Sequence, residues 1–177
     1  ELNHIEVDEW CKTNVDGIFA IGDVASAPWL AHKASHEGVM VANLIAGKDP
    51  IPVNKASIAN CTYSYPEIAS IGLTEQQAID KKIKINIGNF PLIGNGKAVV
   101  LDDTDGFIKT IYNAETGELL GAHMIGPNVT ELIGSYAIGL GLEITDEDFV
   151  HTILPHPTLS EAIHESALDA LGKAIHI

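Results

Sequence analysis

Apolar and polar residues change their spacing along the chain, and each spacing predicts a different element. Residues 17–22, GIFAIG, form a short apolar run bounded by polar residues, which predicts a buried strand of the parallel type. From residue 31 to 46 apolar residues recur near helical spacing and Gly47 follows, which predicts a helix. The proline-rich stretch GKDPIPVNKA interrupts this pattern and indicates a domain boundary between residues 47 and 54.

Beyond residue 54 the pattern predicts strands first and helices afterwards. The stretch ASIANCTYSYPEIASIGLT predicts a strand, a loop and a strand, and a hairpin is expected from strands 107–112 and 119–125. Helices are expected at 74–82 and after Asn128, Thr145 and Thr158. This order favours an α+β fold for residues 54–177, with an antiparallel sheet and helices on one side.

Four of the predicted helices begin with the same sequence device. A capping residue is followed three positions later by a residue that can reach back to it, as in a capping box. The pairs are Thr74/Gln77, Asn128/Glu131, Thr145/Asp148 and Thr158/Glu161. Because the device recurs, capping is the default interpretation of Glu161.

The net charge and the two cysteines limit which classes of binding partner and which cellular compartment are expected. The chain has 10 Lys, no Arg and 24 acidic residues, a net charge of −14, which argues against nucleic acid and anionic lipid and suits a basic protein partner. Its apolar runs fall short of the roughly 20 residues that span a membrane. Cys11 and Cys61 lack metal-binding spacing and are expected to be buried, inert thiols in a reducing compartment, cytoplasmic or mitochondrial.

The stretch LPHPTLSEAIHESAL (154–168) carries one candidate base. Pro155 and Pro157 restrict the backbone of His156, and Glu161 follows five residues later. A histidine on a rigid turn facing a carboxylate can act as a general base, although a turn before a capped helix explains the same residues. We expect the remaining histidines of this region to lie on the surface: His151, His164 and His176.

A second candidate locus lies in the first part of the chain. Asp23 follows the predicted strand at the end where α/β sheets bind ligands, although a turn or cap aspartate is the simpler interpretation. The backbone N–H groups of Leu30 to His32 begin a helix and could face an electron-rich ligand. Without a ligand, His32 and Lys33 are expected to form a solvated first turn. No reaction follows from these residues alone.

Several stretches, in this order and spacing, resemble the flavin disulfide reductases. They are TNVDGIFAIGDV…WLAHKASHEG, YSYPEIASIGLTE, DGFIKTIY…GELLGAHMIGP and HPTLSEA, which together cover essentially the whole chain. HPTLSEA is more similar to the dihydrolipoamide dehydrogenase branch than to glutathione or mercuric reductases. Leu154-Pro155 departs from the His-Ala common in that branch.

The resemblance implies that the chain contains parts of two domains with different roles. Residues 1–47 would be the tail of an α/β FAD-binding domain, and residues 54–177 the interface domain of a homodimer. Asp23 would bind the ribityl chain of FAD, and Trp29, Leu30, Ala31 and His32 would lie against the isoalloxazine. His156 would be the acid–base residue oriented by Glu161, with a cis bond between His156 and Pro157. No metal is implied.

The resemblance also implies a reaction and partners for a longer parent protein. That parent would oxidise dihydrolipoamide and pass electrons through a redox disulfide and FAD to NAD⁺. It would serve a 2-oxo acid dehydrogenase complex through the basic subunit-binding domain of the acyltransferase. The family's GxGxxG and CxxxxC motifs would lie upstream of residue 1, so the chain alone is expected to be inactive and free of FAD. The alternatives are another flavin disulfide reductase and a non-enzymatic dimerisation module.

Overall fold

The computed structural model describes residues 3–176, and the chain divides into two compact units between Lys55 and Ala56. The first unit holds a 3-10 helix, Gly22–Val24, and one long helix, α1 (Ala31–Ile45), as the apolar spacing predicts. Its small core is formed by Cys11, Met40 and Val41.

The predicted buried strand at residues 17–22 is wrong for this chain. Phe19 forms a single antiparallel bridge with Lys12, and Ile18 is 53% exposed. A strand of the parallel type is buried because neighbouring strands and covering helices shield both of its faces. Among the described residues of the first unit no strand is present to do so, so the apolar run stays extended and partly exposed.

The second unit is built on a five-stranded antiparallel sheet in the order β1-β2-β5-β4-β3. The predicted hairpin is confirmed as the β4–β5 pair at the sheet's centre. The bounds are β1 (Asn60–Thr62), β2 (Glu67–Gly72), β3 (Ile85–Pro91), β4 (Phe107–Asn113) and β5 (Leu119–Gly126).

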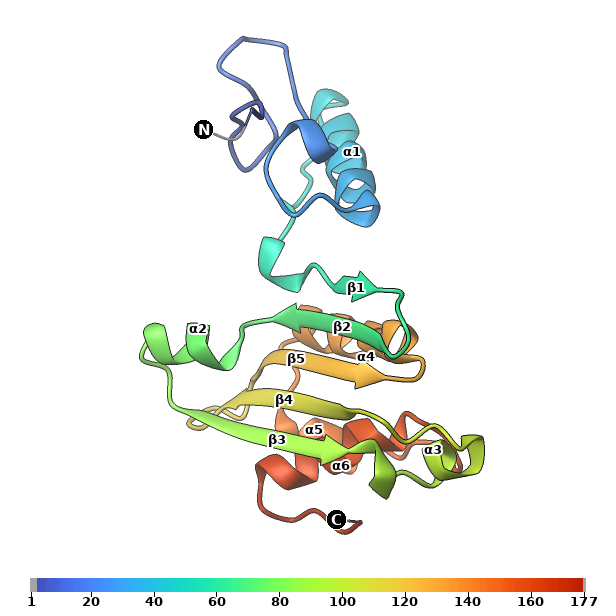
Figure 1. Cartoon of the computed structure of the whole chain (residues 1–177). Coiled ribbons are helices and arrows are strands. Elements are labelled where there is room, and N and C mark those ends of the chain that lie inside the picture. Colours follow the sequence, from blue (N-terminus) through green and yellow to red (C-terminus); the bar gives the residue numbers. More distant parts are fainter. Residues whose placement is uncertain (1–2, 177) are drawn as a thin grey trace. The chain divides into compact units, whose positions relative to one another are not determined.

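Helices cover one face of this sheet (Figure 1). α4 packs on β2 and β5, α6 packs on β3 and β4, and α5 packs on α6. The predicted α+β fold with an antiparallel sheet and helices on one side is confirmed. The helices of the unit are α2 (Glu75–Asp80), α3 (Gly96–Leu101), α4 (Val129–Gly141), α5 (Asp146–His151) and α6 (Glu161–Ala170).

Two of the predicted capping boxes form and a third does not. Those of α2 and α5, at Thr74 and Thr145, have both of their hydrogen bonds. Asn128 instead adopts a left-handed backbone conformation (φ 56°) and its side chain does not cap α4. The carboxylate of Glu67 in β2 replaces it, accepting from the backbone N–H of Thr130 at 3.1 Å and from its hydroxyl at 2.7 Å.

A close approach between backbones fixes the position of α6 on the sheet. A Cβ atom at Gly88 in β3 would lie 1.7 Å from the carbonyl oxygen of Ser166 in α6. The buried Ser166 also contacts the hydroxyls of Thr110 in β4 at 3.2 Å and Tyr136 in α4 at 3.3 Å. α6 is therefore held by packing and by hydrogen bonds, which makes it a rigid carrier for the side chains at its start.

Candidate functional site

The turn before α6 presents one histidine toward solvent and toward a carboxylate. The His156–Pro157 peptide bond is cis, as the resemblance implies. The His156 side chain is 75% exposed, and its Nδ1 lies 2.8 Å from Oε1 of Glu161. The structure thus brings together the two residues that the sequence singles out.

Glu161 is the first residue of α6, so the helix begins three residues later than Thr158. Its Oε2 accepts a hydrogen bond from the Thr158 backbone N–H at 2.8 Å, one half of the predicted capping box. The other half is wrong, because the Thr158 hydroxyl donates to the carbonyl oxygen of Pro155 at 2.7 Å. The hydroxyl closes the preceding turn, so Glu161 braces this turn and holds His156 at the same time.

The electrostatics of Glu161 favour its ionised form. Partial burial raises the pKa of Glu161, but hydrogen bonds from the Thr158 N–H and from His156 outweigh burial and leave the pKa below its ordinary value. An ionised carboxylate can only accept, so the His156 proton sits on Nδ1 and Nε2 keeps its lone pair. The exposed Nε2 can then take a proton from an external donor.

The His156–Glu161 pair lines a cavity of about 560 Å³ in the second unit. Its apolar wall includes Phe90, Ile153 and Leu154. Polar side chains from further along α6 and beyond it line the same cavity, namely His164, Glu165 and His176.

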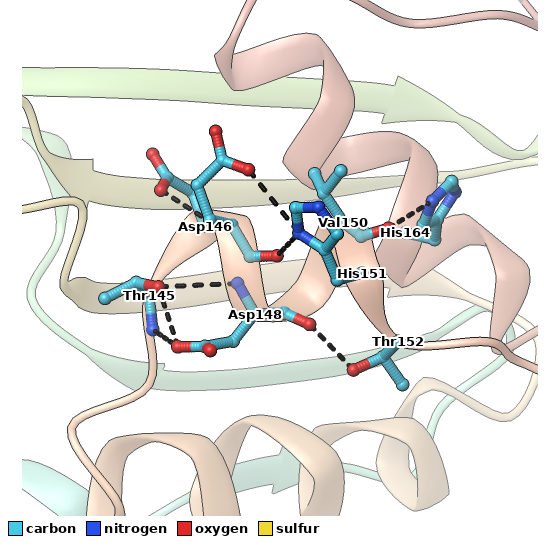
Figure 2. Close-up of polar contacts among 8 residues, drawn as sticks. Thr145, Asp146, Asp148, Val150, His151, Thr152 and His164 are labelled. Atoms are coloured by element: carbon cyan, nitrogen blue, oxygen red, sulfur yellow. Dashed lines mark hydrogen bonds and ion pairs between the residues drawn. The ribbon is translucent and has the colours of Figure 1, made fainter.

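Of the three histidines expected on the surface, His151 and His176 are exposed, whereas His164 is not. His151 contacts the backbone carbonyl of Glu147 within α5. His164 is half-buried and donates to the carbonyl oxygen of Val150 at 3.1 Å, tying α6 to α5 (Figure 2). His176 Nδ1 lies 2.6 Å from Oε1 of the buried Glu165. Sequence reasoning missed this second pair because its partners are eleven positions apart with no motif between them.

The residues of the second candidate locus lie in and around two elements of the first unit, the 3-10 helix Gly22–Val24 and the start of α1. Asp23 is exposed and lies in the 3-10 helix that begins at the buried Gly22, whose φ is +68°. Trp29 is exposed, and Leu30 precedes α1 in an extended conformation without a side-chain cap. Ala31 and His32 form the first turn of α1, which therefore presents backbone N–H groups at its start.

A buried ion pair ties these two elements together. Lys33, expected in a solvated first turn, is 1% exposed, and its Nζ lies 2.9 Å from Oε1 of Glu37. Oε2 of Glu37 accepts from the backbone N–H of Gly22 at 2.8 Å. The expectation for Lys33 is therefore wrong. The available signal was a Lys and a Glu four apart on an otherwise apolar helix face.

The two cysteines of the chain, Cys11 and Cys61, are free thiols. Cys11 is buried as expected, whereas Cys61 is half-buried, and burial raises the pKa of both thiols. Both are free and poorly nucleophilic. Across residues 3–176 no cluster of three His, Cys, Asp or Glu side chains could hold a metal ion. In that same range no helix is long and apolar enough to cross a membrane.

Two family models match the chain. Residues 58–167 match the dimerisation domain of the pyridine nucleotide-disulphide oxidoreductases, and residues 1–38 match the pyridine nucleotide-disulphide oxidoreductase model. The two matches fall on either side of residue 55, where the chain divides.

Curated relatives named dihydrolipoyl dehydrogenase align along almost all of the chain. The enzyme of Zymomonas mobilis is 54% identical over 97% of the chain, and that of Bacillus subtilis is 46% identical over 99%. The chain spans about 37% of the length of each. Among solved structures, LpdA from Mycobacterium tuberculosis superposes with a TM-score of 0.87 at 27% identity, covering 93% of this chain and 36% of LpdA.

Proposed function

Because the chain belongs to the pyridine nucleotide-disulphide oxidoreductase family, we propose that it is the C-terminal part of a dihydrolipoyl dehydrogenase. The reaction of the whole enzyme would be the oxidation of dihydrolipoamide by NAD⁺ to lipoamide and NADH, through a redox disulfide and FAD. The observation that carries the proposal is the 2.8 Å contact between His156 Nδ1 and Glu161, with His156 exposed beside a cavity.

His156 is the proposed acid–base residue. Its Nε2 would take the proton of a dihydrolipoamide thiol, and the resulting thiolate would attack a disulfide sulfur. Glu161 would hold the Nδ1–H tautomer before the transfer and stabilise the imidazolium after it. Neither Cys11 nor Cys61 supplies the disulfide, since they stand 50 positions apart and lack the CxxxxC spacing of the redox pair. The disulfide would come from the partner subunit of a homodimer.

The first unit fits one end of an FAD site. Gly22 has a positive φ and places Asp23 in an exposed turn, where its carboxylate can accept hydrogen bonds from the hydroxyls of a ribityl chain. The start of α1 offers N–H groups, from Leu30 to His32, to an electron-rich edge of the ring, and Trp29 offers an exposed aromatic face. FAD when bound would supply the two-electron transfer. We expect these contacts of the first unit to be too few to hold FAD on this chain alone.

The partners follow from the same proposal. Residues 54–177 would form the homodimer interface, and residues 1–47 would complete the FAD-binding domain. The net charge of −14 suits a basic subunit-binding domain in the acyltransferase of a 2-oxo acid dehydrogenase complex.

The test of the proposal mixes two inactive full-length enzymes. One carries His156→Ala and the other lacks the redox cysteines, so a heterodimer contains one intact composite site. We expect dihydrolipoamide oxidation to return in the mixture and not in either parent. Heterodimers that demonstrably form and stay inactive would refute the assignment of His156 to the partner's disulfide.

A further inference from the structure

Two carboxylates one turn apart on α6 each accept from the Nδ1 of a histidine. Oε1 of Glu161 lies 2.8 Å from Nδ1 of His156, which is in the segment before the helix. Oε1 of Glu165 lies 2.6 Å from Nδ1 of His176, which is in the segment after the helix. Side chains four apart on a helix point the same way, so the two pairs are neighbours on one face of α6.

Glu165 uses all of its hydrogen bonds to hold residues 175–176. Besides His176 Nδ1, its Oε2 accepts from the backbone N–H of Ile175 at 3.0 Å and from that of His176 at 3.4 Å. Glu165 is 5% exposed. A buried carboxylate is unfavourable unless it is well hydrogen-bonded. Burial raises the pKa of Glu165, but the bond from His176 and those from the backbone outweigh it and lower the pKa.

The held segment forms part of the wall of the cavity that contains His156. Ile175 and His176 line that cavity together with His156 and Glu161. The backbone of His176 packs close to Gly94, where a Cβ atom would lie 2.9 Å from the His176 carbonyl oxygen. Burial raises the pKa of Glu161, and the hydrogen bonds from the Thr158 N–H and from His156 lower it. The charge of His176 lowers this pKa further, as the smallest of these causes. The segment that the second pair holds therefore lies in the wall of the cavity beside the first pair, and the charge of His176 acts on Glu161.

We propose that Glu165 and His176 are positioning residues for the His156–Glu161 pair. By fixing residues 175–176 in the cavity wall, they keep Glu161 turned toward His156 and set the tautomer of its imidazole. This proposal rests on the proposed function, in which His156 is the base.

The experiment measures the imidazole tautomer of His156 in this chain by side-chain ¹⁵N NMR, with the histidines neutral. In the unaltered chain we expect the Nδ1–H form to dominate, because Glu161 can only accept from it. In Glu165→Gln, which keeps the acceptor but loses the charge, and in His176→Ala, we expect this excess to be lost. Glu147→Gln is the matched control, since it removes the carboxylate next to His151 on the exposed face of α5.

Each outcome separates this proposal from the function on which it rests. If both variants fold and His156 keeps the Nδ1–H form in each of them, the positioning role is refuted and the proposed function stands. If His156 in the unaltered chain already has the tautomer ratio of a free imidazole, its pairing with Glu161 fails and both proposals fall. A change of tautomer in both variants, with none in Glu147→Gln, supports the positioning role.

Discussion

At His156 a single carboxylate decides which ring nitrogen can accept a proton. Glu161 also braces the turn that carries His156, through the N–H of Thr158. The sequence motif places the two residues five apart, and the structure shows why that spacing works: α6 begins at Glu161 itself. The pair of Glu165 with His176 was not predictable, because its partners are eleven positions apart. The burial of Lys33 had a local signal, since its partner Glu37 is four positions away on the same helix.

Substitution of His156 and Glu161 tests the proposed acid–base pair. In the full-length enzyme, His156→Ala should lower kcat by on the order of 10²–10⁴, the usual range for loss of a general base. Glu161→Gln should lower kcat less, because the amide still accepts from Nδ1–H while the charge is lost. Steady-state kinetics with dihydrolipoamide measure both. An equal loss for both variants would mean that Glu161 does more than orient the imidazole.

The lowered pKa values of Glu161 and Glu165 predict a dependence of stability on pH. Both carboxyls bind protons less readily in the folded chain than in the unfolded chain, whose glutamates titrate near about 4.3. Their contribution is therefore present above that pH and is lost as pH falls through the lower folded-state values. Urea unfolding from neutral to acidic pH measures the slope. The double variant Glu161→Gln, Glu165→Gln should flatten it.

At the scale of elements, alternation and capping signals predict the sheet and most helices, because these depend on neighbours in sequence. The hairpin of β4 and β5 and the capping boxes of α2 and α5 form as predicted. The run at residues 17–22 does not form a regular strand, because a strand is stabilised by neighbours that no local pattern supplies. The packing of α6 on β3 likewise depends on a contact between distant backbones.

Gly88 should be intolerant of even one added methyl group. In Gly88→Ala the new Cβ would meet the Ser166 carbonyl, so β3 and α6 must separate, at a cost of about 1–3 kcal/mol. Gly134→Ala in α4 is the control, since no atom lies within 4 Å of its Cβ position and alanine favours helices. Urea denaturation measures both. A Gly88→Ala chain as stable as the unaltered one would contradict the close approach.

At the scale of the molecule, the match to a dimerisation domain covers residues 58–167, nearly all of the second unit. That unit exposes large apolar side chains, among them Ile138, Leu142 and Ile153. Exposed apolar side chains of this kind are common at interfaces between subunits. The resemblance and the apolar stretch ELIGSYAIGLGL (131–142) predict an interface in this unit. The spacing alone does not say which apolar residues belong to it, because those of an interface and of a core obey the same spacing.

We expect this chain to form a homodimer in solution. Analytical ultracentrifugation at concentrations on the order of 10 µM should show twice the mass of the chain, as an extensive interface requires. Ile153→Asp, which places a charge on a side chain that is 97% exposed, should weaken the dimer without unfolding the unit. A monomer in the unaltered chain would contradict the proposed interface.

The Glu67 carboxylate at the start of α4 has a consequence for the order of folding. Its hydrogen bonds to Thr130 span 63 positions of sequence, so the side-chain cap of α4 comes from a distant strand and not from its own N-cap residue, Asn128. Closing so long a loop requires that β2 already lies against β5. The first turn of α4 should therefore form after the rate-limiting step. Stopped-flow measurements on Thr130→Ala should show faster unfolding and a nearly unchanged folding rate.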